Sequence, residues 1–143
     1  MKAIRYMVMV LLAAAAALSC TPDEDFDSSL SGSWQLTGWN GASPSGMEVY
    51  MVLRDDRSFT LYQKYNTLGF VRYDGTFTVD GSRISGIYSD GKAWVSGYTY
   101  TVNGNTLTMV SEVSPDTGLS ETSVYTRHEL PETITGGNFE NFI

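Results

Sequence analysis

Residues 70–91 read FVRYDGTFTVDGSRISGIYSDG, and this stretch decides the fold. Two segments, residues 70–79 and 83–88, alternate apolar and polar side chains with the period of two that is typical of a half-buried β-strand. Asp80-Gly81 separates the segments and Asp90-Gly91 follows the second one. Both dipeptides accept the positive φ of a tight hairpin turn. The stretch therefore predicts two antiparallel strands with a further strand to follow.

The same pattern extends over residues 32–129, where no segment shows a sustained helical period. Short segments rich in Val, Tyr, Thr, Phe and Trp alternate with turns throughout. We expect eight strands, at residues 33–39, 47–54, 58–64, 70–79, 83–88, 93–102, 106–113 and 122–128. Every clear connection is short, whereas parallel strands need crossovers of a dozen or more residues. The strands should therefore form an antiparallel meander.

An all-β fold, an eight-stranded antiparallel up-and-down barrel, is the architecture we expect, and a β-sandwich is the alternative. Consecutive hairpins favour the barrel, because a Greek-key sandwich needs long returns between its two sheets. Gly75, Gly86 and Gly97 fall inside expected strands. Glycine weakens pairing there but permits the bends that close a small barrel.

The N-terminal residues resemble a lipoprotein signal peptide. Lys2 and Arg5 form a basic n-region, and residues 7–18 are an apolar run too short to span a bilayer. Cys20, the only cysteine in the chain, follows where a bacterial lipobox is cleaved and its cysteine acylated. We expect a signal peptide at residues 1–19 and a lipid anchor on Cys20. The alternative is a free thiol after an ordinary secretory signal.

An acidic tether, residues 20–31, links this segment to the folded domain. It contains Asp23, Glu24, Asp25 and Asp27. The run resembles the acidic sorting signal that sends lipoproteins of Bacteroidota to the outer face of the outer membrane. A solvated linker has the same composition. We expect an outer-membrane lipoprotein, and its exposure at the cell surface or in the periplasm stays open.

The charge balance is acidic. The chain has nine basic and sixteen acidic residues, a net charge of −7, and cleavage after residue 19 leaves seven basic residues against sixteen acidic, a net charge of −9. Such a charge disfavours nucleic acid as a partner and direct adsorption to anionic headgroups. The membrane contact that we expect is therefore the lipid anchor alone.

The first expected strand opens with Gly32-Ser33-Trp34, which resembles the Gly-x-Trp motif of lipocalins and their bacterial lipocalin-like relatives. The last expected strand carries Tyr125-Thr126-Arg127, where that family has a basic residue. Together with residues 86–91 and Leu130-Pro131, the whole of residues 32–131 resembles the lipocalin-like lipoproteins of Bacteroidota. The resemblance implies a lipocalin-like barrel in which Arg127 packs over Trp34 at the closed end.

Alternation along the strands separates an inward set of side chains from an outward set once Trp34 is placed inside. The inward set is apolar and aromatic: Leu36, Val49, Met51, Leu53, Phe59, Leu61, Tyr73, Phe77, Val79, Ile84, Tyr88, Trp94, Tyr98, Tyr100, Leu107, Met109 and Tyr125. The outward set is polar except for Tyr50, Val52 and Tyr62, which we expect under the C-terminal segment or at a partner surface. Residues 132–143 are expected to form a C-terminal tail, either a cover across one barrel end or a loose segment.

An eight-stranded barrel is either filled by its own side chains or holds one small ligand. Five inward aromatic residues combine apolar walls with polar tips, and these are the candidate ligand-binding residues: Tyr73, Tyr88, Trp94, Tyr98 and Tyr100. We expect a lipid-anchored envelope protein that binds a small hydrophobic or amphipathic molecule. The alternative is a packed barrel that binds an envelope protein, a protease or a glycan. A cavity on the order of a few hundred Å³ would favour the ligand.

The sequence contains no catalytic or metal-binding signature. His128 is the only histidine and lies at a strand end, and an acylated Cys20 is no nucleophile. The chain lacks a His/Cys cluster with metal-ligand spacing. Asp74 and Asp90 could meet across a loop, but their spacing does not require it. We therefore expect no enzymatic activity, no cofactor and no metal ion.

Overall fold

The computed structural model describes residues 27–66, 69–136 and 140–141. These residues contain one 3₁₀ turn, nine strands and one short helix: η2 (Ser28–Leu30), β1 (Gly32–Trp39), β2 (Met47–Leu53), β3 (Ser58–Tyr65), β4 (Val71–Asp80), β5 (Arg83–Tyr88), β6 (Tyr98–Asn103), β7 (Thr106–Ser111), β8 (Thr122–Arg127), α2 (Glu132–Thr135) and β9 (Glu140–Asn141). The expected signal peptide, Cys20 and most of the acidic tether lie outside the described residues. Within the described part of the chain, no helix is long and apolar enough to span a membrane.

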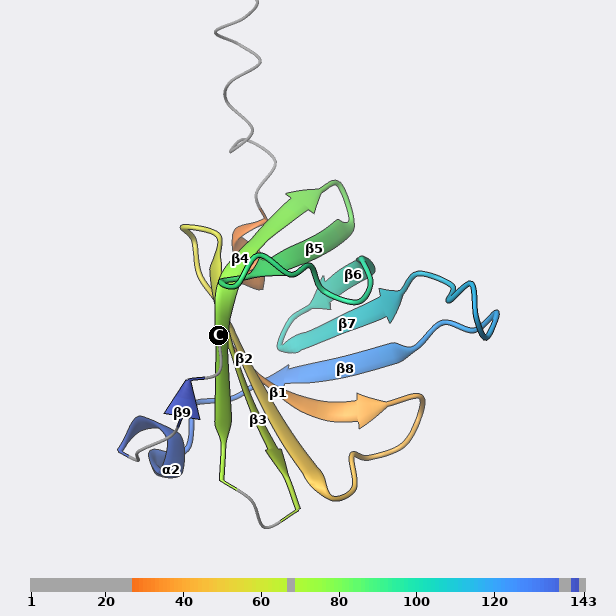
Figure 1. Ribbon diagram of the computed structural model, residues 1–143. Coiled ribbons are helices and arrows are strands. Elements are labelled where there is room, and N and C mark those ends of the chain that lie inside the picture. The colour runs from red at the N-terminus through yellow and green to blue at the C-terminus, as the bar shows by residue number, and fades with distance from the viewer. Residues whose placement is uncertain (1–26, 67–68, 137–139, 142–143) are drawn as a thin grey trace, which may run out of the picture.

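Strands β1 to β8 form a closed antiparallel barrel (Figure 1). Each strand pairs with the next, and β8 returns to pair with β1, so that Trp34 lies opposite Arg127 and Leu36 opposite Tyr125. The barrel is thus confirmed, and the β-sandwich is excluded. A register shift between Leu36 and Gly38 marks a bulge in β1 at this closing seam.

The expected strand at residues 93–102 is wrong in its first half. The regular strand β6 begins only at Tyr98, and Ala93 makes an isolated bridge to Ile87 of β5. Four residues separate Ala93 from Tyr98, whereas two separate their partners Ile87 and Ile84. The two extra residues form a bulge, and Val95 within it is fully exposed. The β5–β6 seam is therefore the least regular part of the barrel wall.

The two ends of the barrel differ. At the end where β1 begins and β8 ends, which we call the closed end, η2 packs across the barrel and Leu30 is completely buried. Asp27 fixes the turn, because its carboxylate accepts a hydrogen bond from the Ser29 backbone N–H at 3.0 Å. The Trp34 indole Nε1 donates to the Leu30 carbonyl at 2.8 Å. The opposite end, which we call the open end, carries the long β1–β2, β3–β4, β5–β6 and β7–β8 connections.

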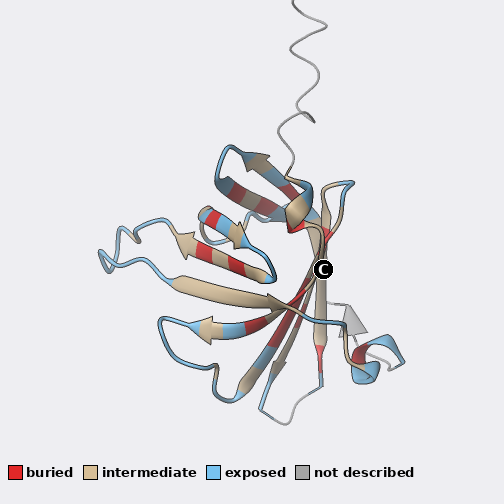
Figure 2. Cartoon of the chain, turned by 180° about the vertical axis from the view of Figure 1, so that it is seen from behind, coloured by how far each residue is buried: buried red, intermediate tan, exposed pale blue. Residues whose placement is uncertain are grey.

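A second apolar cluster lies outside the barrel, where Tyr50, Tyr62, Phe70 and Ile134 are buried against one another. Figure 2 shows the buried patch on α2 that faces the wall. The first of the two expected positions for Tyr50 and Tyr62 is thus confirmed, since they lie under the C-terminal segment. The described part of that segment, α2 and β9, packs beside β4 on the outer wall (Figure 1). It neither covers a barrel end nor hangs loose, because Ile134 buries its side chain there.

Candidate functional site

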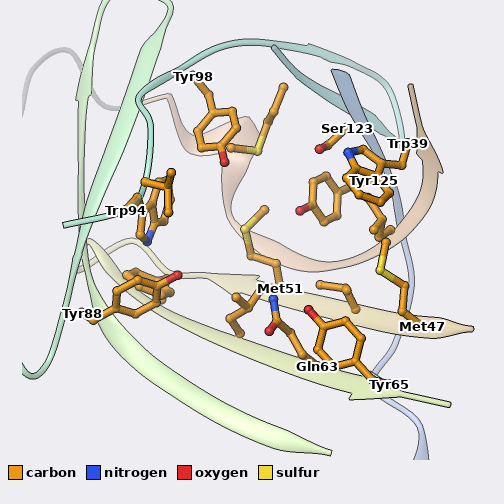
Figure 3. A pocket seen from close by; sticks show the side chains of 16 residues that line it. Trp39, Met47, Met51, Gln63, Tyr65, Tyr88, Trp94, Tyr98, Ser123 and Tyr125 are labelled. Atoms are coloured by element: carbon orange, nitrogen blue, oxygen red, sulfur yellow. The ribbon is translucent and has the colours of Figure 1, made fainter. Parts of the chain in front are cut away.

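A cavity of about 260 Å³ lies inside the barrel and opens at the open end. Sixteen residues line it, and none of them carries a charge (Figure 3). Aliphatic and methionine side chains of β1, β2, β3 and β7 form one side, and aromatic side chains of β5, the β5–β6 connection and β6 form the other. The volume approaches the roughly 300–1,000 Å³ of drug-sized ligand pockets. The barrel is therefore not filled by its own side chains.

The aromatic side of the interior is a continuous row of rings. Tyr73 contacts Tyr88 with 6.0 Å between ring centroids, Tyr88 contacts Phe59 at 5.7 Å, Phe59 contacts Trp94 at 5.2 Å, and Trp94 contacts Tyr98 at 6.0 Å. The interplanar angles of 60–71° are those of edge-to-face pairs. Such pairs stabilise a wall by about 0.5–1.5 kcal/mol each beyond the burial of their area.

Two glycines make room for this row. A Cβ atom on Gly86 would lie 2.2 Å from Cε2 of Trp94, and one on Gly75 would lie 2.7 Å from the Phe59 ring. We expected these glycines to permit bends in the strands. The structure shows that the two rings lie directly against the glycine backbone, in the space that a side chain would occupy.

Four tyrosines line the cavity with their hydroxyls toward it (Figure 3). Tyr65 of β3 is half exposed, and the other three are Tyr88, Tyr98 and Tyr125. Burial raises the pKa of these last three. The pKa of Tyr125 is raised further by the neighbouring Tyr98 and Tyr88, so the three hydroxyls are close enough to influence one another. Within the described part of the chain, none of these hydroxyls has a protein hydrogen-bond partner in the structure. They remain available to a molecule in the cavity.

The structure places three of the five candidate ligand-binding residues, Tyr88, Trp94 and Tyr98, on the cavity wall. Tyr73 stands behind Tyr88 in the aromatic row and does not line the cavity. Tyr100 does not line the cavity either. Its hydroxyl lies 3.4 Å from the Asp27 carboxylate and 3.4 Å from the Gly81 carbonyl, at the closed end. Because β6 runs toward that end, Tyr100 is two residues, about 6.6 Å, deeper than Tyr98.

Other lining residues were not among the candidates. Tyr125, Met109 and Leu36 were assigned to the interior but not to the ligand site, and all three line the cavity. Gln63 and Ser123 add polar atoms to the lining. The sequence pattern does not show how β8 pairs with β7 and β1. This pairing places Ser123 opposite Met109 and Tyr125 opposite Leu36.

The closed end is held by Arg127. Its guanidinium carbon lies 4.2 Å from the centre of the Trp34 ring, a cation–π distance. The same guanidinium donates to the Ser31 carbonyl at 2.8 Å and to the Ser29 carbonyl. Trp34 is completely buried. Arg127 therefore joins the last strand to the turn that seals the barrel.

The remaining titratable residues named from the sequence have structural contacts. Asp74 accepts hydrogen bonds from the Thr60 hydroxyl at 2.7 Å and from the Arg72 guanidinium. Asp90 accepts one from the Lys92 backbone N–H in the β5–β6 turn. His128 is exposed, and its ring lies 6.0 Å from that of Tyr50. Among the described residues, no three His, Cys, Asp or Glu side chains are grouped closely enough to hold a metal ion.

A closed eight-stranded meander with one sealed end and an internal cavity has the architecture of the up-and-down barrels that enclose small molecules. A model of the lipocalin-like domain family matches residues 30–109, more than half of the chain. The chain therefore belongs to the lipocalin-like domain family.

Among solved structures, a lipocalin-like protein from Bacteroides uniformis superposes with a TM-score of 0.54 at 18% sequence identity, over 70% of this chain and 99% of that chain. A structure described as the REP1-NXSQ fatty acid transporter superposes with a TM-score of 0.45 at 14% identity, over 73% of this chain and 100% of that chain. No curated protein matches the sequence. At these identities the first similarity shows the fold alone.

Proposed function

We propose that this protein binds a small hydrophobic or amphipathic molecule inside the barrel. The observation that supports the proposal most strongly is the open cavity of about 260 Å³, whose mostly apolar lining includes the hydroxyls of Tyr88, Tyr98 and Tyr125, which have no protein hydrogen-bond partner among the described residues. Apolar walls with a few convergent polar groups are the usual composition of a ligand pocket. The protein acts in this proposal as a carrier or receptor and not as an enzyme.

A second candidate function is binding of an envelope protein at the open end. Large apolar side chains are exposed around the cavity mouth and in the neighbouring β7–β8 connection: Trp39 is 42% exposed, Tyr65 50% and Leu119 69%. Exposed apolar residues gathered at one end of a molecule are typical of an interaction surface. Such a partner would approach the cavity mouth, so this function is compatible with ligand transfer.

We also propose that a lipid on Cys20 anchors the protein to the outer membrane, as a surface or periplasmic lipoprotein. Asp27, the first described residue, lies at the closed end beside Tyr100. An anchor seven residues before Asp27 would therefore hold the closed end toward its membrane, and the cavity mouth would face away from it. Cys20→Ala should move the protein out of the membrane fraction. Unchanged fractionation of that variant would contradict the anchor.

Ligand binding can be tested with a cavity-blocking variant. Ser123 is the smallest side chain in the cavity wall, so Ser123→Trp places an indole inside the mouth. Ser120→Trp is the matched control, because Ser120 is exposed in the β7–β8 connection. A panel of fatty acids, sterols, haem and bile acids should change tryptophan fluorescence and raise the melting temperature for wild type and Ser120→Trp only. If wild type responds to no member of the panel, the protein-binding function is favoured instead.

A further inference from the structure

The lining of the cavity restricts the chemistry of its ligand. None of the sixteen lining residues is charged, so an ionised group brought inside would meet no counter-ion. Burying an isolated carboxylate or ammonium without a partner is far costlier than burying a hydroxyl or an amide that finds a hydrogen bond. The cavity therefore accepts a polar group only if that group is uncharged.

The charged groups that act on Tyr98 and Tyr88 are acidic. Glu121 acts on Tyr98 and Asp90 acts on Tyr88, and each interaction raises the pKa of the tyrosine beyond the effect of burial. The whole chain carries a net charge of −7. An anionic head would be repelled by this field. A cationic head would be attracted to the mouth, where Lys92 already lies 3.8 Å from the Asp90 carboxylate, but would find no carboxylate in the lining.

The hydroxyls of Tyr88, Tyr98 and Tyr125 are uncharged polar groups of the lining, which also contains Gln63, Tyr65 and Ser123. The first three hydroxyls converge on the cavity from β5, β6 and β8 (Figure 3), and each can both donate and accept a hydrogen bond. A tyrosine with its ordinary pKa of 10.0 is protonated at neutral pH, and burial raises the pKa of these three further. A hydroxyl or carbonyl group placed among them gains partners, while the apolar part of the molecule contacts Met47, Met51 and other apolar side chains.

We propose that the cavity selects an uncharged amphipathic molecule whose hydroxyl or carbonyl group is recognised by Tyr88, Tyr98 and Tyr125. This selectivity rests on the proposed function, because it names the class of ligand for the same cavity. We expect ionised fatty acids to bind weakly, and alcohols, ketones and phenols of similar shape to bind more tightly.

A matched headgroup series tests the proposal. The purified protein is titrated by calorimetry at neutral pH with 1-octanol, octanoate and octyltrimethylammonium, which share one apolar chain. Octanol should bind at least about tenfold more tightly than either ion. Octanoate should gain affinity at a pH low enough to protonate it.

Replacing single tyrosines by phenylalanine tests which hydroxyls bind the ligand. Tyr88→Phe, Tyr98→Phe and Tyr125→Phe should each weaken octanol binding by about threefold to tenfold, the loss expected for one hydrogen bond. Tyr73→Phe is the matched control, because Tyr73 belongs to the same aromatic row but does not line the cavity, and it should bind octanol like wild type.

The outcomes separate this inference from the function on which it rests. If none of the three compounds binds, and the wider panel is also inactive, the proposed function itself fails. If octanoate or octyltrimethylammonium binds as tightly as octanol, the cavity is a ligand site but does not select a neutral head. If the three lining variants bind octanol like wild type, or no worse than Tyr73→Phe, the hydroxyls do not recognise the ligand and the inference is overturned.

Discussion

Arg127 lies opposite Trp34 on the paired strands β8 and β1, with its guanidinium carbon 4.2 Å from the centre of the indole ring. The arginine also donates to two carbonyls of the turn that crosses the closed end. One side chain thus covers the most buried tryptophan and fixes the turn that seals the barrel. The cavity opens at the other end of the barrel.

Trp34→Ala should lower the free energy of unfolding by about 3–5 kcal/mol, the usual cost of removing a large buried aromatic side chain. The indole is completely buried and its Nε1 donates to Leu30. Urea denaturation followed by circular dichroism measures the change. A variant as stable as wild type would show that the indole contributes nothing to the closed end.

Arg127→Met should cost about 1–3 kcal/mol, because it removes the cation over Trp34 and leaves the Ser31 carbonyl without its donor. Arg127→Lys is the control that keeps the charge, and it should recover only part of the loss because an ammonium cannot reproduce the planar fork. Full stability of the methionine variant would contradict a structural role for this residue.

Gly75 and Gly86, which lie behind the aromatic row, should differ in how much stability is lost when each is replaced by alanine. A methyl group on Gly75 would lie 2.2 Å from the Ile87 backbone carbonyl, so Gly75→Ala should destabilise the protein by about 1–3 kcal/mol. On Gly86 the obstacle is the Trp94 side chain, which can move, so Gly86→Ala should cost less and change the tryptophan emission. Gly69→Ala should be neutral, because a Cβ added there would meet nothing within 4 Å among the described residues.

A double-variant cycle isolates the contact between Gly86 and Trp94. In a Trp94→Ala background, Gly86→Ala should no longer reduce stability, because the obstructing ring is absent. An equal cost of Gly86→Ala in both backgrounds would mean that the methyl group acts through something other than the indole.

Stability should fall at alkaline pH. Burial raises the pKa of Tyr125 above its ordinary value of 10.0, so the folded protein keeps a proton that the unfolded chain loses above about pH 10. The unfolded state then binds fewer protons, and the free energy of unfolding decreases as the pH rises. Denaturation over a pH series should show a shallower decrease for Tyr125→Phe.

The apolar cluster outside the barrel indicates that the C-terminal segment contributes to the stability of the protein. Ile134 is buried against Tyr50, Tyr62 and Phe70, so Ile134→Ala should cost about 2–5 kcal/mol by urea denaturation. Thr133→Ala in the same helix is a control, because Thr133 is exposed and its replacement should have little effect. An unaffected Ile134→Ala variant would show that the segment is not held by this contact.

The alternation of side chains predicted most of the fold, because a strand with one face inside a barrel must repeat with a period of two. It could not reveal the bulge after Trp94. The bulge adds two residues, so Trp94 and Tyr98 both keep the inward face that an unbroken strand would give them. An insertion of two residues leaves an alternation with a period of two unchanged, so the sequence pattern could not show it.

The ligand site was less predictable than the fold, because alternation gives the face of a residue but not its depth. Tyr98 and Tyr100 share the inward face, yet only Tyr98 reaches the cavity. Tyr125 was placed inside but could not be matched with Tyr98, because strands β6 and β8 are separated by β7 and their relative register depends on both pairings with β7.

Native mass spectrometry of the protein from its own host is the most direct test of ligand binding inside the barrel. Wild type and Ser120→Trp should carry an additional small mass that is released on denaturation, and the extracted molecule should be soluble in organic solvent. Ser123→Trp, in which the cavity mouth is filled, should have the mass of the bare protein. A bare mass for wild type, or an equal additional mass on Ser123→Trp, would contradict binding in the cavity.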